Sequence, residues 1–160
     1  MESLAATCKE SAVRGMERFL KTFSFVPDDK LTWTPTPTAK SAIRIAAHTA
    51  LTAGNMARVI RAGTFPGRDE FLERMAQSTA AEAALTSRTE IESEYRKNTA
   101  EVLAALDSLT PEQIGASLET GFGQPMPMTL LMQMPGIHGM SHAAQIEYLQ
   151  TCWGDQEMHF

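Results

Sequence analysis

The sequence lacks several features that would direct it to a membrane, a nucleic acid or an oxidising compartment. No hydrophobic run approaches the ~20 residues of a membrane-spanning helix. The two cysteines, Cys8 and Cys152, are too few for a disulfide framework, and we expect both to be reduced. There is no basic stripe and the net charge is −5, so nucleic acid lacks its usual electrostatic attraction. The N-terminus does not resemble a secretory signal. We therefore expect a cytoplasmic protein with neither membrane nor nucleic-acid partners.

The composition is that of one ordinary globular domain. Hydrophobic residues make up 43% of the 160 residues and charged residues 21%, so the chain is neither disordered nor unusually polar. A chain of this length buries roughly two thirds of its unfolded surface in a single core. We expect one domain that spans residues 1–160.

The spacing of apolar residues predicts four long helices. Positions three and four residues apart recur as on the inward face of an amphipathic helix. The helices are expected at residues 4–26, 39–62, 79–109 and 129–153. Gly63 should end the second helix, and no segment alternates as a β-strand should. The sequence thus predicts an all-α protein, a four-helix bundle with long crossover connections.

The expected connections contain their own signals. Residues 31–38 alternate proline with threonine, which favours an extended crossover. Residues 63–77 read as a loop with one or two helical turns. The sequence Thr110-Pro111-Glu112-Gln113 predicts a capped short helix. Within the last helix, Pro135 and Gly136 predict a kink just before His138.

Three of the four histidines fall on faces predicted to point inward. His138 and His142 are four residues apart, so both imidazoles can reach one metal ion from the same helical face. His48 occupies the inward stripe of the second helix, whereas His159 lies at the chain end. The members of that stripe are Ile45, His48, Thr52, Asn55, Met56 and Val59. Side by side, buried imidazoles need hydrogen-bond partners or a shared cation. The pattern is compatible with a three-histidine metal site or with hydrogen-bonded core histidines.

Three further residues are candidates for the surroundings of that site. Gln145 follows His142 on the predicted inward stripe and could orient a ligand, or it could be a polar core residue. Asn55 lies two turns beyond His48 and could point toward the same cavity. Met134 belongs to a cluster of methionines near the start of the last helix, which suits adaptable core packing or a pliable pocket wall.

A lone histidine in the second helix, followed by His-x-x-x-His-x-x-Gln-Ile in the last, resembles the DinB/YfiT-like superfamily. The resemblance covers nearly the whole chain and includes residues 33–37, 40–48, 138–149 and 151–154. It implies a four-helix bundle of unusual helix order, often a homodimer. It also implies a divalent metal, zinc or nickel, held by His48, His138 and His142.

The chain departs from common forms of the superfamily motif beside its last histidine. Many relatives have a second histidine there and Arg-Gly before the glutamine, whereas this chain reads Ser141-His142-Ala143-Ala144-Gln145. The three ligand positions are retained. Any substrate or dimer contact that the missing arginine makes is therefore in question.

The resemblance implies a thiol-dependent transferase or isomerase that uses a low-molecular-weight thiol, or a metal-dependent hydrolase. Bound metal would lower the pKa of a thiol or a water. No acidic residue stands out as a general base, which favours a thiol-dependent S-transferase or isomerase acting on a small electrophilic molecule. The alternative from another class is a non-catalytic, stress-linked binding or dimerisation module whose metal is structural or absent. Structural zinc sites normally have four protein ligands, and only three are apparent here.

Overall fold

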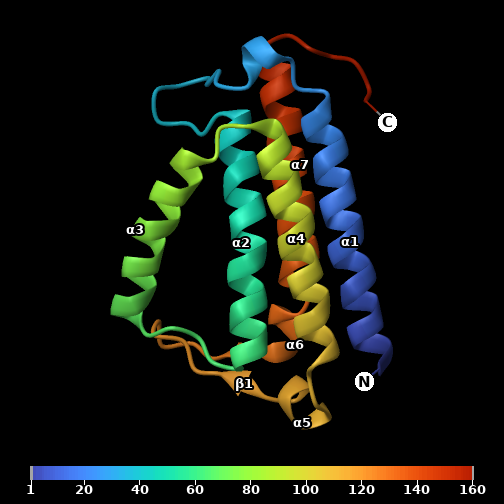
Figure 1. Cartoon of the computed structure of the whole chain (residues 1–160), viewed down its shortest axis with the longest axis vertical. Helices are drawn as coiled ribbons and strands as arrows, with labels where there is room; N and C mark the ends of the chain where they lie inside the picture. Colours follow the sequence, from blue (N-terminus) through green and yellow to red (C-terminus); the bar gives the residue numbers. More distant parts are fainter. Residues whose placement is uncertain (1, 160) are drawn as a thin grey trace.

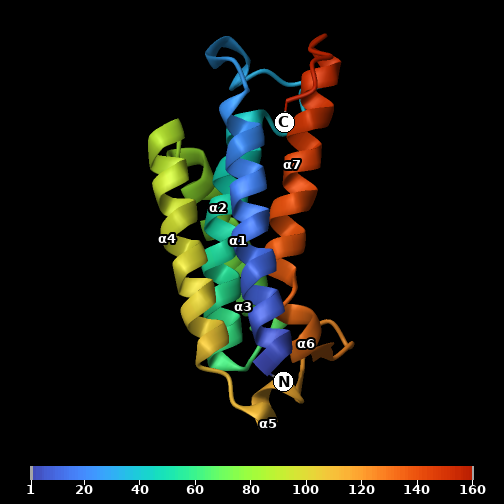
Figure 2. The ribbon, with the colours of Figure 1, turned by 90° about the vertical axis from the view of Figure 1, so that its right-hand side faces the viewer.

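The computed structural model describes residues 2–159, and its centre is a bundle of four long helices (Figures 1 and 2). These are α1 (Glu2–Ser24), α2 (Ala42–Ala62), α4 (Arg88–Asp107) and α7 (Met134–Cys152). Helices α1 and α7 run in one direction, and α2 and α4 run in the other. Each of α1 and α2 packs against both α4 and α7. The predicted all-α four-helix bundle is confirmed.

Two diagonal connections give the bundle its helix order. Because α1 and α2 stand at opposite corners, residues 25–41 cross one end of the bundle, with a short helical turn, η1 (Asp28–Lys30). The ring of Trp33 packs edge-on against that of Trp153, which anchors this crossover to the end of α7. At the other end, residues 108–133 lead from α4 to α7. No helix among the described residues is long and apolar enough to cross a membrane.

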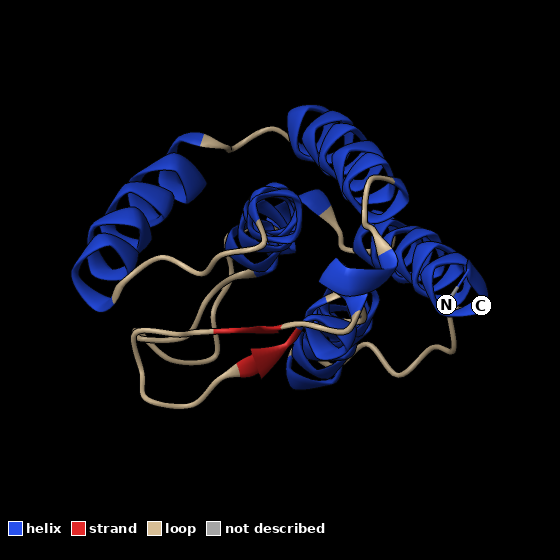
Figure 3. Cartoon of the chain, turned by 90° about the horizontal axis from the view of Figure 1, so that it is seen from below, coloured by secondary structure: helices blue, strands red, loops and turns tan. Residues whose placement is uncertain are grey.

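The second crossover contains small elements that were only partly predicted. Helix α5 (Pro111–Ile114) begins with the expected capping box between Thr110 and Gln113. Strands β1 (Ser117–Leu118) and β2 (Met126–Pro127) then pair in an antiparallel hairpin, seen from below in Figure 3, and α6 (Met128–Leu131) follows. The expectation of no strand was wrong for these two short segments, which are too short to show an alternating pattern.

The region between α2 and α4 differs most from the prediction. In place of a loop and one helix over residues 79–109, the chain forms a separate helix, α3 (Arg68–Ala84). Leu85 then takes an extended conformation, and Ser87 caps α4 by accepting a hydrogen bond from the Glu90 N–H. Glu82 is the only buried residue described in α3. The helix therefore has no apolar stripe that periodicity could detect.

The buried face of α2 is also not the predicted one. The core side of α2 is rich in alanine, and a Cβ on Gly54 would lie 2.8 Å from the Asn98 side chain of α4. Small residues allow α2 and α4 to approach closely. Most of the predicted inward stripe is instead only partly buried and lines a cavity; its members are His48, Thr52, Asn55, Met56 and Val59. As predicted, α2 ends at Gly63, which has a positive φ of 63°.

Helices α1 and α7 pack with their backbones in contact. A Cβ on Gly15 would lie 2.6 Å from the Gly136 carbonyl oxygen, and one on Gly139 would lie 2.8 Å from the Gly15 carbonyl oxygen. Pro135 stands in the first turn of α7, where proline is tolerated because its missing N–H has no helical partner. Pro135 therefore lies at the start of α7 and not inside a longer helix, and the interruption falls earlier than predicted, between α6 and α7.

Candidate metal centre

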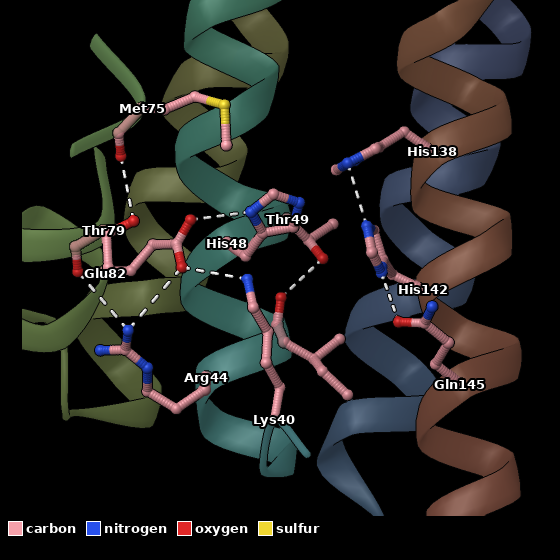
Figure 4. Close-up of polar contacts among 11 residues, drawn as sticks. Lys40, Arg44, His48, Thr49, Met75, Thr79, Glu82, His138, His142 and Gln145 are labelled. Carbon is pink, nitrogen blue, oxygen red and sulfur yellow. Dashed lines mark hydrogen bonds and ion pairs between the residues drawn. The ribbon is translucent and has the colours of Figure 1, made fainter. Parts of the chain in front are cut away.

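The three predicted histidines lie together between α2 and α7 (Figure 4). One ring nitrogen of each lies within 4.8 Å of the others. The Nε2 atoms of His138 and His142 are 3.0 Å apart. The ring centroid of His48 lies 5.2 Å from the ring centroid of His138 and 5.0 Å from that of His142. The site forms because α2 and α7 are antiparallel neighbours and because four-residue spacing stacks the α7 pair on one face. All three side chains are partly buried.

A carboxylate that the sequence did not reveal orients His48. Glu82, from α3, lies 2.7 Å from His48 Nδ1, and its side chain is only 6% exposed. An ionised carboxylate can only accept a hydrogen bond, so Nδ1 of His48 carries the proton. Its Nε2 then has a free lone pair that can bind a cation shared with the other two histidines. This is the carboxylate–histidine arrangement that commonly fixes metal-binding imidazoles.

Two cations share that carboxylate. Lys40 Nζ lies 3.2 Å from Glu82 and an Arg44 guanidinium nitrogen lies 3.8 Å away. Burial alone raises the pKa of Glu82, but the hydrogen bonds from His48 and Lys40 outweigh burial and hold the pKa below its ordinary value. The sequence gives one indication of such a carboxylate. Lys40, Arg44 and His48 follow one another at four-residue intervals, and basic side chains at this spacing lie close together, which favours a nearby acidic residue.

Gln145 has the predicted neighbour but not the predicted burial. Its side chain is exposed rather than inward, because the core side of α7 is formed by Gly139, Ala143 and Ile146. Its Oε1 atom lies 2.7 Å from His142 Nδ1. An amide oxygen accepts, so Nδ1 of His142 donates and its Nε2 also faces the cluster with a lone pair.

The electrostatics of the α7 pair favour neutral imidazoles. Burial, reinforced by His142, His48 and Lys40, lowers the pKa of His138 to about 3. Burial also lowers the pKa of His142, although the hydrogen bond to Gln145 opposes it. Metal ions bind neutral imidazole. Three converging nitrogens, two of them oriented through Nδ1, therefore fit a divalent cation that prefers nitrogen ligands.

A cavity of about 760 Å³ opens from His48 into the space between α2 and α3. Asn55 and Met134 both line it, although Asn55 hydrogen-bonds Arg58 and not a histidine. A second, more open hollow of about 620 Å³ lies on the other side, where His48 and His142 meet Gln145 and Tyr148. His48 thus lines both hollows and His142 lines the second, so there is room for ligands beside the cluster.

The comparisons with known proteins agree with this architecture. The sequence profile of the DinB superfamily matches residues 12–146, a range that contains all three histidines. A crystal structure of the DinB-like protein YjoA from Bacillus subtilis superposes with a TM-score of 0.67 over 96% of each chain, at 19% sequence identity. That likeness concerns the fold. None of the curated proteins compared with the chain matches it.

Proposed function

The chain belongs to the DinB superfamily, and from that premise we propose that it is a divalent-metal-dependent enzyme. Its reaction is a thiol-dependent S-transfer or isomerisation on a small electrophilic molecule. Zinc or nickel is the metal that the three-histidine set favours. The bound cation would supply a Lewis acid that lowers the pKa of a thiol.

One observation carries the proposal: His48 and His142 line cavities, and no fourth protein ligand joins the three histidines among the described residues. The described His, Cys, Asp and Glu residues form one group able to hold a metal, and it contains only His48, His138 and His142. Three protein ligands leave coordination positions for a substrate, whereas structural zinc sites are normally closed by four. An open site beside a cavity of about 760 Å³ supports catalysis.

The state of Glu82 favours a thiol over a water as the nucleophile. A hydrolase needs a general base near neutral pKa to take a proton from water. Glu82 is the buried acid beside the histidines, and it is engaged by His48 and Lys40 with its pKa lowered. A thiol loses its proton far more readily than water does, so it needs no such base.

The transfer is balanced without a further reactant. The thiol sulfur forms a bond to the electrophilic carbon, the bond from that carbon to its leaving group breaks, and the thiol proton ends on the leaving group. In the isomerase version, the sulfur adds to an activated double bond, rotation follows, and the thiol is released unchanged. His48, His138 and His142 would hold the cation, and Glu82 and Gln145 hold two of the rings in place.

Two other functions follow from the same residues. A metal-dependent hydrolase would use the same cluster on a polarised carbonyl, and a non-catalytic binding or dimerisation module would use the metal as a structural link or lack it. Metal content and activity separate these ideas. The purified protein is analysed for zinc and nickel, and then assayed with cysteine, glutathione and coenzyme A against a chromogenic chloroarene, and with a chromogenic ester.

We expect bound metal and thiol conjugation that is lost in His48→Ala and after chelation. Ester cleavage without thiol conjugation would establish the hydrolase instead. Metal that is absent, together with a His48→Ala variant unchanged in every assay, would overturn the enzyme proposal. Circular dichroism of the variant checks that the bundle remains folded.

The exposed face of α7 supports a homodimer. Ile137, Met140 and Tyr148 are 46%, 48% and 69% exposed and fall on one helical face together with Ala144. Such a continuous apolar stripe is uncommon on a monomer surface. A second copy packed there would also cover the hollow beside His142. Sedimentation of wild type and Tyr148→Lys tests this: the wild type should be dimeric and the variant monomeric.

The cytoplasm is the compartment that these features favour. Cys8 and Cys152 are both free thiols in the structure, as suits a reducing environment. A thiol co-substrate also stays reduced there. Fractionation of cells that express the protein at native level tests the assignment.

A further inference from the structure

Helix α3 lies beside α2 at a tilt and forms the outer wall of the larger cavity (Figure 1). At one end it is attached through Glu82, which contacts Lys40 and His48 of α2 and the segment before it. At the other end Phe71 stacks on Phe65 and meets Phe122 edge-on. Between these two attachments the cavity separates α3 from α2, with a volume typical of small-molecule sites, roughly 300–1,000 Å³.

The lining of this cavity changes from polar to apolar along its length. Near the histidines it is lined by polar groups, including Thr52, Thr79 and Glu82. At the far end it is lined by Val59, Phe65, Phe71 and Met126. His48 and Val59 lie eleven positions apart on α2, which corresponds to about 16 Å along the helix axis. A ligand that fills the cavity is therefore elongated, with a polar end at the histidines.

The charged groups at the cavity do not create a second polar end. Arg58 hydrogen-bonds Asn55 on its own helix, and Arg74 hydrogen-bonds Glu70 one turn away on α3. The carboxylate of Glu94, on α4, accepts hydrogen bonds from Lys97 and Asn98. Both arginines are exposed. The inner apolar wall also includes Met56 and Met134, whose flexible thioethers adapt to the shape of a bound chain.

We propose that the α2–α3 cavity is a tail-binding site, which gives the substrate an uncharged aliphatic or aromatic tail several carbons long. The reactive polar head lies at the histidines and the tail extends toward Phe71. The assignment of the head rests on the function proposed above. The assignment of the tail rests on the cavity lining alone.

Alkyl hydroxamates test both ends, because the hydroxamate group binds divalent metals and the alkyl chain can be lengthened stepwise. Binding of the series from acetohydroxamate to decanohydroxamate to the zinc-loaded protein is measured by calorimetry. We expect the dissociation constant to fall by about fourfold per added methylene, the factor that corresponds to ~0.8 kcal/mol per buried CH₂. The straight-chain alcohols from butanol to decanol serve as probes without a metal-binding head.

Val59→Trp should shorten the usable cavity. Its tryptophan would occupy the far end, so the gain per methylene should stop at a shorter chain than in wild type, while acetohydroxamate binds unchanged. Leu72→Trp is the matched control, since Leu72 is 52% exposed on α3 and does not line the cavity. Phe71→Ala provides a second variant, in which the gain should extend to longer chains.

The outcomes separate the two assignments. Length dependence in the alcohols with no hydroxamate advantage would leave the tail site standing and contradict the metal-bound head. Affinity independent of chain length in both series would overturn the tail site. So would a length dependence that Val59→Trp and Phe71→Ala leave unchanged in folded protein.

Discussion

Removal of the Glu82 carboxylate should weaken metal binding, although Glu82 is not itself one of the predicted ligands. Glu82 lies 2.7 Å from His48 Nδ1 and its side chain is 6% exposed, so the hydrogen bond is protected from water. Loss of such a partner typically costs 10- to 100-fold in metal affinity, roughly 1.4–2.7 kcal/mol. We expect the loss of metal affinity in Glu82→Ala to lie in this range, because the His48 ring is then free to rotate.

The conservative variant divides this effect into charge and orientation. Glu82→Gln keeps an oxygen that can accept from His48 but loses the charge. A hydrogen bond to a charged group contributes ~1.5–3 kcal/mol and a neutral one ~0.5–1.5 kcal/mol. The metal affinity of Glu82→Gln should therefore be roughly tenfold below that of the wild type. Lys40 and Arg44 would then also face the cation without a counter-charge.

Competition against a chromogenic zinc chelator measures both affinities. Glu73→Gln and Glu73→Ala are the matched controls, since Glu73 lies on the exposed side of the same helix. These controls should bind zinc as the wild type does. Wild-type affinity in a folded Glu82→Ala protein would refute the reasoning that Glu82 positions His48.

Three further predictions concern the α7 side of the centre. Gln145→Ala should weaken zinc binding less than Glu82→Ala, because Gln145 is exposed and uncharged; the same chelator competition measures it. Gly139→Ala should lower stability by roughly 1–3 kcal/mol in urea unfolding, since its Cβ would lie 2.6 Å from the Tyr95 hydroxyl. An unchanged midpoint would contradict that contact. The pKa of His138 is about 3 in the folded protein against 6.5 in an unfolded chain, so the unfolded state binds more protons between these values. Metal-free protein should therefore lose stability as pH falls from about 6.5, and His138→Gln should show a shallower decline.

The sequence predicted what depends on local spacing. His138 and His142 are adjacent because four residues are about one helical turn, and that relation does not depend on the rest of the fold. The capping box at Thr110 and the glycine end of α2 at Gly63 were likewise local and were confirmed. Spacing alone left the position of His48 beside the pair as one of two alternatives, since α2 and α7 meet only in three dimensions, and the superfamily pattern favoured the three-histidine site.

The part of the candidate site that could not be predicted from the sequence lies on helix α3. Its one buried residue, Glu82, is paired with polar partners and so leaves no apolar pattern. The predicted core face of α2 failed for a related reason. Hydrophobicity selected Met56 and Val59, whereas close packing selected alanines and Gly54, and the larger side chains line the cavity.

The departures from the superfamily motif fall outside the histidine cluster. Ser141 and Ala144 line the more open hollow beside His142, and Ala143 is buried in the core. These positions alter the wall of the second hollow and leave the three ring nitrogens where they converge. Differences from relatives should therefore appear in what the second hollow accepts.

The glycine contact between α1 and α7 makes one half of the centre rigid and the other adjustable. No side chain separates the two backbones at Gly15 and Gly139. A displacement of α7, which carries His138 and His142, therefore cannot be accommodated by side chains between α1 and α7 that change rotamer. The ring of His48, on α2, is oriented instead by Glu82 of α3, a helix that the larger cavity separates from α2 over much of its length. Exchange of one metal for another of different bond length should therefore move α3 and leave α7 in place.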